Sequence, residues 1–306
     1  MSAAVDNLTR DGFVRLGNFL SADEVMQLQN ECARFMEMPA VSYEQYKTVD
    51  KHAATYQPRL YADGDRTIAV DLIGTSKTFD RIIEKVVGHP IVRDTLEAVL
   101  GRGYKLWQVN LRRHEPGSNG QLLHQDAPGE LGLSLLVSDT PSLNGATVFL
   151  PHSHRWPINY SDVGLDLRPR LLRPMLSGAT GAAGETSLFF NRTWHGRYPG
   201  QGSASTILIS FFAVGASYPI HEPPPEVLAS LGPELQRLLD PTVGVRRTDG
   251  NRVIVDGEIN APSALRYALR GVEGVTRAPH WNALRLIGRA RRIVGRVRAR
   301  LGVKLS

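Results

Sequence analysis

The hydrophobic pattern between residues 104 and 215 restricts the possible folds more than any other feature of the chain. Short segments of β type follow one another here, separated by turn signals: KLWQVNLRRHEPG, LGLSLLVSD, GATVFLPHS, GETSLFFN and STILISFFAVG. Strands of this length with no helical pattern between them are typical of antiparallel sandwiches and barrels. We therefore expect a mainly β fold with flanking helices.

Helical patterns precede this region. The stretch SADE predicts the start of a helix, with Ser21 as the N-cap and Glu24 completing a capping box, and apolar residues follow at helical spacing. The stretch TFDRIIEKVVGHPIVRDTLEAVLG predicts two further helices, because Gly88 and Pro90 interrupt its pattern. These helices are expected to pack against the β region.

The remaining segments are less regular. Residues 40–75 are predicted to be irregular, as are residues 155–180, and both would shape a pocket. After the barrel segments, a proline-rich linker (HEPPPE) precedes a predicted helix around Val227 to Leu239 and a predicted hairpin in RTDGNRVIVDGEI.

The composition indicates a globular protein. Its 42% apolar and 22% charged residues are ordinary values, and no apolar run reaches the roughly 18 residues of a membrane span. The N-terminal sequence lacks the pattern of a secretory signal, and Cys32, as the only cysteine, excludes an intrachain disulfide. We therefore expect a cytoplasmic protein.

The net charge of +6 comes from the last segment of the chain. Residues 281–306 hold eight of the 36 Lys and Arg residues and no acid, which leaves 28 basic against 30 acidic residues before them. This basic amphipathic tail has three open interpretations: contact with an anionic membrane at its inner face, a solvated helix packed on the body or a partner subunit, or nucleic-acid binding. Nucleic acid is least favoured, because no recognition motif is present and the body is acidic.

The stretch LLHQDAPGE suggests a metal site. His124 and Asp126 are two residues apart, so in a strand both side chains would point to one face, and His195 in GETSLFFNRTWHG offers a third ligand at the end of an apolar strand. Two His and one carboxylate form the set that leaves positions open on Fe(II). The residues could equally be surface groups before a turn and a core histidine. His152 and His154 form a second candidate pair.

Four stretches resemble the phytanoyl-CoA dioxygenase family of Fe(II)- and 2-oxoglutarate-dependent oxygenases. In the family's order and spacing, from about residue 10 to residue 215, they are DGFVRLGNFLSADE, LLHQDAPGE, NGATVFLPHSHR and GETSLFFNRTWHG. The third departs from the family's usual Pro-Gly-Ser-His, because His152 replaces the glycine. The resemblance implies that His152 and His154 lie in a loop and are not ligands.

The resemblance implies a double-stranded β-helix, a jelly-roll barrel of cupin-like form. Its domain would span residues 1–220, with an N-terminal helical buttress and a barrel core at about 104–215. Residues 221–280 would form a C-terminal extension with a helix and a hairpin, and residues 281–306 the basic tail. His124, Asp126 and His195 would bind Fe(II) and be catalytic, with 2-oxoglutarate as cosubstrate and O2 as oxidant.

The cosubstrate anchor departs from the family pattern. Family members place an arginine eleven residues after the distal histidine and a small hydroxyl residue two after it, whereas this chain has Thr206 and Arg197 at those positions. We predict an exchange, in which Arg197 binds the far carboxylate and Thr206 supplies the hydroxyl. The alternatives are that Arg197 is solvated and that Arg112, Arg192 or no residue is the anchor.

One strand offers further contacts for the cosubstrate or the substrate. In LWQVNLRR, Gln108, Asn110 and Arg112 are predicted to share a polar face that lines a cavity. The other face would hold Trp107, Val109 and Leu111. The alternative is that the polar face is simply exposed to solvent.

The resemblance implies a dioxygenase that hydroxylates an unactivated C–H bond and releases succinate and CO2. Because Asp126 is a carboxylate, it resembles the hydroxylases rather than the halogenases of the superfamily. The substrate would be a small-molecule or lipid-linked metabolite. Two alternatives stay open: a barrel that has lost 2-oxoglutarate binding and serves as a binding or scaffold protein, and a metal barrel of the cupin type.

Overall fold

The structure, a computed structural model, describes residues 2–50, 56, 58–126, 129–156, 168–219, 223–247 and 252–258. Its helices are α1 (Ala3–Asp11), α2 (Ala22–Phe35), α3 (Tyr43–Asp50), α4 (Lys77–Val87), α5 (Pro90–Leu100), α7 (Pro225–Ser230) and α8 (Pro233–Leu239), with 3-10 turns η1 (Ser153–Arg155) and η2 (Pro169–Met175). Its strands are β1 (Phe13–Asn18), β2 (Ala40–Ser42), β3 (Arg59–Asp63), β4 (Arg66–Val70), β5 (Lys105–His114), β6 (Gln121–His124), β7 (Glu130–Leu136), β8 (Thr147–Phe149), β9 (Ser177–Gly178), β10 (Glu185–Phe190), β11 (His195–Arg197), β12 (Ala204–Phe212), β13 (Ser217–Pro219), β14 (Val245–Arg247) and β15 (Arg252–Val255). The predicted tail, residues 281–306, lies outside the described residues.

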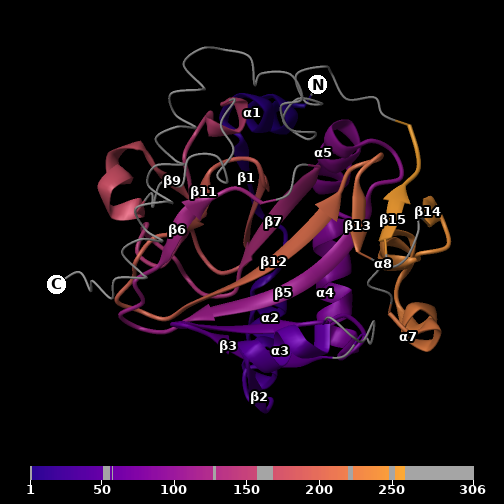
Figure 1. Ribbon diagram of the computed structural model, residues 1–306, viewed down its shortest axis with the longest axis horizontal. Coiled ribbons are helices and arrows are strands. Elements are labelled where there is room, and N and C mark those ends of the chain that lie inside the picture. The colour runs from indigo at the N-terminus through magenta and orange to yellow at the C-terminus, as the bar shows by residue number, and fades with distance from the viewer. Residues whose placement is uncertain are drawn as a thin grey trace, which may run out of the picture.

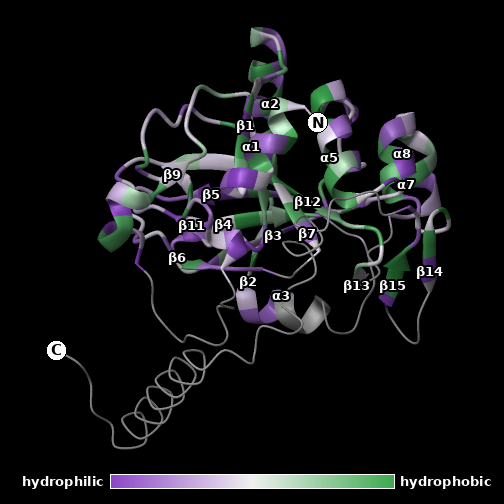
Figure 2. Ribbon diagram, turned by 90° about the horizontal axis from the view of Figure 1, so that it is seen from above, coloured by the Kyte–Doolittle hydropathy of each residue, from purple (hydrophilic) through white to green (hydrophobic). Residues whose placement is uncertain are grey.

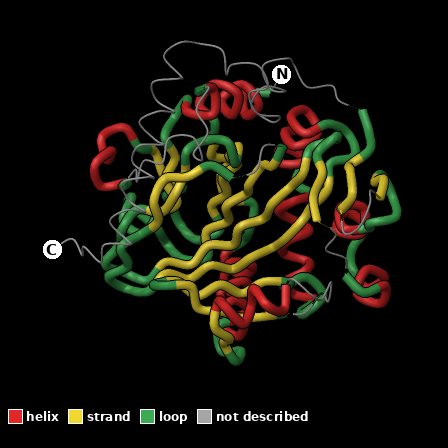
Figure 3. Tube along the Cα trace, viewed as in Figure 1, coloured by secondary structure: helices red, strands yellow, loops and turns green. Residues whose placement is uncertain are grey.

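Two sheets form a barrel (Figures 1 and 3). The large sheet has the order β1-β10-β7-β12-β5-β4-β3-β2, and the small sheet has the order β6-β11-β8-β9. Apart from the short β9, which follows β8 in the small sheet, successive strands from β5 to β12 alternate between the sheets: β5, β7, β10 and β12 belong to the large one, and β6, β8 and β11 to the small one. This alternation of antiparallel strands confirms the predicted jelly roll.

Helices cover the outer face of the large sheet. Seen from above, α1, α2 and α5 lie on one side of the strands, and α3 lies on the other (Figure 2). The main core contains fully buried residues of the helices together with outward residues of the strands, among them Leu28, Ile82, Leu96, Leu111, Leu133 and Ile207. The capping box at Ser21 and Glu24 is present, and α4 and α5 meet at Gly88 and Pro90, so both helix predictions are confirmed.

The inner face of the large sheet carries buried polar side chains. Along β7, Leu131, Leu133 and Leu135 join the helix-covered core, so the residues between them point into the barrel. Cross-strand partners share a face, and the register aligns Ile68, Arg112 and Thr206 in one row. The barrel interior therefore combines a polar region with a small apolar cluster of Phe149, Ala179 and Phe189.

The prediction for β5 is wrong at one residue. Val109 and Leu111 lie in the main core, but Trp107 packs edge-on against Phe212 in a separate cluster. The register between β5 and β12 shifts at this point, because Ser210 pairs with Gln108 and Phe211 with Leu106. Trp107 is the extra residue of a β-bulge, which turns its side chain out of the alternation.

Residues 40–75 are not irregular, and that prediction is wrong. β3 and β4 form an antiparallel hairpin around Gly64, whose φ of 65° suits the left-handed conformation that glycine adopts readily. β4 pairs with β5 and so extends the large sheet. Residues 155–180 also contain η2 and β9, while residues 157–167 lie outside the description.

The C-terminal extension differs from its prediction in one element. The single helix expected at Val227 to Leu239 is two helices, α7 and α8, because Gly232 caps α8 and Pro233 is its first residue. The predicted hairpin is confirmed as β14 and β15. In the part of the chain that the structure describes, no helix has the length and apolar content to cross a membrane.

Candidate metal centre

Two neighbouring strands of the small sheet carry the predicted histidines. β6 ends at His124, β11 begins at His195, and the two residues are paired in register. His195 therefore starts a strand rather than ending one, because β10 stops at Phe190 and a turn with a hydrogen bond from Thr193 to Phe190 intervenes. Strand pairing thus brings together residues that lie far apart in the sequence.

The loop after β6 brings the carboxylate to both imidazoles. Asp126 Oδ2 lies 3.2 Å from His195 Nε2, and Asp126 Oδ1 lies 3.7 Å from His124 Nε2. The amide of Asp126 donates to the carbonyl of Asn191 at 2.9 Å, which holds the loop beside β10. One ligand atom from each residue lies within 4.8 Å of the others, a spacing that a single metal ion can bridge.

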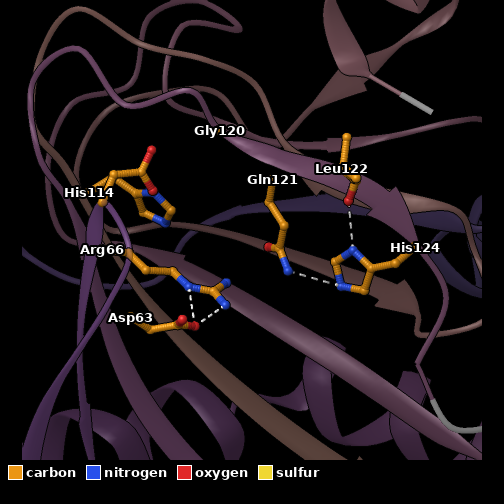
Figure 4. A pocket seen from close by; sticks show the side chains of 8 residues that line it. Asp63, Arg66, His114, Gly120, Gln121, Leu122 and His124 are labelled. Carbon is orange, nitrogen blue, oxygen red and sulfur yellow. Dashed lines mark hydrogen bonds and ion pairs between the residues drawn. The ribbon is translucent and has the colours of Figure 1, made fainter. Parts of the chain in front are cut away.

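The other ring nitrogens orient the histidines. His124 Nδ1 is 2.9 Å from the carbonyl of Leu122, as Figure 4 shows, and His195 Nδ1 is 2.7 Å from that of Thr193. A carbonyl oxygen only accepts, so each Nδ1 carries a proton, and in the neutral ring Nε2 then presents its lone pair to the Asp126 side. Burial lowers the pKa of His124 to about 4, which keeps this ring neutral. Neutral imidazoles with one carboxylate fit a divalent metal.

The far end of the barrel interior is cationic. Arg112, Arg197 and Thr206 line a narrow cavity that begins at His195. Arg197 is buried and its Nη2 donates to the carbonyl of Ala204 at 3.1 Å. The Nε atoms of both arginines lack a hydrogen-bond partner, and among the described residues no carboxylate forms an ion pair with either guanidinium. Burial lowers the pKa of Arg197 to about 9.

The other candidates occupy distinct places. Arg192 donates from Nε and Nη2 to the carbonyls of His154 and Trp156, which keeps its guanidinium at that loop. Gln108 and Asn110 share the inner face with Arg112 and pair with Ser210 and Leu208. Neither of them lines the narrow cavity at the arginines.

The second histidine pair serves the fold. His154 is buried, with Nε2 2.9 Å from the carbonyl of Thr9, and His152 Nδ1 is 2.8 Å from that of Arg10. Both rings thus contact the end of α1. The structure does not bring them to the cluster around Asp126.

Sequence reasoning missed two buried ionisable residues of the barrel interior. Glu130, at the start of β7, has side-chain hydrogen bonds to Ser210 and Asn191, and burial raises its pKa to about 7. Burial lowers the pKa of His114, the last residue of β5, to about 2. The strand pattern could have found them. Every second side chain of a strand faces the same side of the sheet, and both residues lie at positions that face the barrel interior.

Comparisons with known proteins agree on family and fold. A family model for phytanoyl-CoA dioxygenase matches residues 8–204, and no curated protein matches. Similar solved structures include SnoN, a non-heme α-ketoglutarate-dependent epimerase from nogalamycin biosynthesis, with a TM-score of 0.53, 17% identity, and coverage of 70% of this chain and 84% of that chain.

Two further structures have the same fold. HygX from Streptomyces hygroscopicus, solved with nickel, 2-oxoglutarate and hygromycin B, gives a TM-score of 0.51 at 14% identity over 70% of this chain and 87% of that chain. EctD from S. alaskensis gives a TM-score of 0.51 at 20% identity, over 70% of this chain and 77% of that chain. Because the family model covers more than half of the sequence, the chain belongs to the phytanoyl-CoA dioxygenase family of Fe(II)- and 2-oxoglutarate-dependent oxygenases.

Proposed function

We propose that this oxygenase hydroxylates an unactivated C–H bond of a small molecule, with Fe(II) held by His124, Asp126 and His195. The observation that carries the proposal is the convergence of the two Nε2 atoms on one carboxylate. A carboxylate in the third position leaves no open site for a halide beside the metal, which favours hydroxylation within the superfamily. With 2-oxoglutarate and O2, bound iron would supply the oxidising chemistry that protein side chains lack.

The chain's own contribution is orientation. The carbonyls of Leu122 and Thr193 hold the two rings in the tautomer that offers Nε2. Phe189 packs 5.0 Å from the His195 ring, centroid to centroid. An added Cβ at Gly132 would come within 2.3 Å of the Phe189 ring, so glycine there leaves room for this contact. These contacts would keep the ligand set rigid and partly dry.

Arg197 is proposed as the anchor for the far carboxylate of 2-oxoglutarate, with Thr206 as its hydroxyl partner. The support is electrostatic, because a buried guanidinium without a carboxylate partner is costly unless an anion joins it. Arg112 lies in register beside Thr206 and adds a second positive charge. Such a site argues against a barrel that has lost its cosubstrate. Gln108 and Asn110 are proposed to contact the cosubstrate or substrate nearer the metal.

An anaerobic titration of the Fe(II)-loaded protein with 2-oxoglutarate tests the proposal. We expect the visible charge-transfer band of a metal-chelated 2-oxo acid. In Arg197→Ala the 2-oxoglutarate concentration for half-saturation should rise by about tenfold or more, since a charged hydrogen bond contributes roughly 1.5–3 kcal/mol. Arg113→Ala is the matched control, because Arg113 pairs with Glu115 at the surface. An unchanged requirement in Arg197→Ala would remove this residue as the anchor.

A further inference from the structure

A second cavity opens beside His124, between the β3–β4 turn and β6 (Figure 4). Its volume is about 330 Å³. Ligand pockets in proteins span roughly 300–1,000 Å³, so this cavity suits a small molecule. Its polar lining residues are Asp63, Asp65, Arg66, His114, Gln121 and His124.

The cavity adjoins both proposed parts of the catalytic apparatus. His124, a proposed iron ligand, forms part of its wall. His114 and Gln121 line this cavity and also the narrow cavity that contains Arg112 and Arg197. A molecule here would thus lie beside the proposed iron ligand His124 and next to the space proposed for the cosubstrate, as a substrate must for oxidation.

The cavity wall opposite His124 offers both hydrogen-bond donors and hydrogen-bond acceptors. Arg66 is in register with Asp63 and with His114, so the three side chains form a row on the inner sheet face. Arg66 binds Asp63 through Nε at 2.9 Å and through Nη2, both to the same oxygen. Among the described residues, no group forms a hydrogen bond with the second oxygen of Asp63 or with Nη1 of Arg66, so both can contact a ligand. His114 Nδ1 is buried without a partner.

Gln121 completes the polar lining. Its amide nitrogen lies 3.5 Å from His124 Nε2, as drawn in Figure 4. That ring nitrogen is the atom proposed to bind iron, so a bound metal would free the amide for a ligand. Asp65 accepts from Ser118 Oγ and from the amide of Asn119, both at 2.8 Å, and so holds the β5–β6 loop over the cavity.

This lining fits polar molecules and disfavours acyl chains. Among the described residues that line the cavity, Leu122 is the one large apolar side chain. An acyl chain would remove water from the ion pair, the amide and the imidazole without replacing their hydrogen bonds, which is unfavourable. A molecule with hydroxyl or amino groups would replace them.

We infer that this cavity is the substrate site and that it takes a small, polyhydroxylated or aminated molecule, not an acyl thioester or a lipid-linked compound. The inference rests on the proposed function, because it uses His124 as an iron ligand. It assigns Arg66, Asp63 and Gln121 to substrate recognition.

Equilibrium binding to Ni(II)- and 2-oxoglutarate-loaded protein tests the inference without turnover. One panel contains amino sugars, cyclitols and amino acids, and the other contains acyl-coenzyme A thioesters and fatty acids of increasing length. We expect calorimetric binding from the polar panel alone. Arg66→Met and the near-isosteric Gln121→Leu should each weaken that binding about tenfold or more, whereas the surface variant Arg113→Met should not.

Three outcomes would overturn the inference: binding by an acyl compound, no binding by any polar compound, or polar binding that both variants leave unchanged. The Fe(II)–2-oxoglutarate band, recorded without any panel compound, reports separately on the proposed function. A normal band in Arg66→Met and Gln121→Leu would show that the variants are folded and competent for the cosubstrate. A missing band in the wild type would instead refute the proposed function.

Discussion

The outer face of the eight-stranded sheet is aliphatic, whereas its inner face carries Asn110, Arg112, Glu130 and Ser134. Each buried Leu, Ile or Val on the outer face contributes roughly 1.5–3 kcal/mol. Polar atoms of Asn110, Arg112 and Ser134 on the inner face have no hydrogen-bond partner in the structure, and such a group costs about 1–3 kcal/mol. The comparison teaches that the outer face stabilises the fold, whereas the inner face holds costly polar groups of the kind that functional sites retain.

The largest effect is expected from the inner side of the barrel. His195→Ala removes a proposed metal ligand, so metal affinity should fall by more than the roughly 10–100-fold that loss of a ligand's supporting contact causes. Equilibrium dialysis with Ni(II) or Fe(II) measures this directly, and the metal-free variant should unfold at about the wild-type urea concentration. His154→Ala is the control, because His154 contacts α1. Equal metal binding by His195→Ala and the wild type would refute the assignment.

A substitution in the core should lower the stability of the protein and leave its metal affinity unchanged. Leu111 is fully buried on the outer face of β5, so Leu111→Ala should lower the free energy of unfolding by about 2–5 kcal/mol. Metal affinity of the protein that remains folded should be unchanged. Urea denaturation measures the stability, and equilibrium dialysis measures the metal affinity. Leu171→Ala is the control, since Leu171 is 78% exposed. Loss of metal binding with unchanged stability would contradict the separation of the two faces.

A buried acid on the inner face makes stability depend on pH. Burial raises the pKa of Glu130 to about 7, from an ordinary value of 4.5. Between these values the folded state keeps a proton that the unfolded chain has lost, so the stabilising difference is complete below about pH 4.5 and disappears as pH rises to about 7. The effect is on the order of 3 kcal/mol.

Glu130→Gln removes this dependence and isolates it from other groups. Relative to the wild type, the variant should gain stability between about pH 4.5 and about pH 8. Urea unfolding at the two pH values gives the difference. If the wild type and the variant differ by the same amount at both pH values, folding does not raise the pKa of Glu130.

The smallest effect is expected at a helix end far from the barrel interior. Ser21 accepts from the amide of Glu24 at 3.2 Å, and Ser21→Ala removes that cap at a cost of about 1 kcal/mol. Thermal unfolding measures the loss, and the Fe(II)–2-oxoglutarate band should keep its wild-type titration. A change in the band would mean that α2 influences the site.

Features predictable from sequence were those that depend on near neighbours. The cap at Ser21, the break at Gly88 and the alternation of β7 arise from contacts within a few residues. The break at Gly232 and the turn at Gly64 carried local signals of the same kind, and both were overlooked. The bulge at Trp107 had no local signal, because the register of β12 creates it.

The candidate site divides in the same way. The spacing of His124 and Asp126 and the motif around His195 were visible in the sequence, and so was the exchange that leaves Arg197 and Thr206 at the two anchor positions. The sequence by itself determined that short strands close into a barrel, and it pointed to the residues that are proposed to carry the chemistry. Only the tertiary structure decided that Arg66, Asp63 and His114 line one row beside His124, because pairing between β3, β4 and β5 sets that row. Strand register is a long-range property, fixed by the packing of whole faces rather than by any one segment.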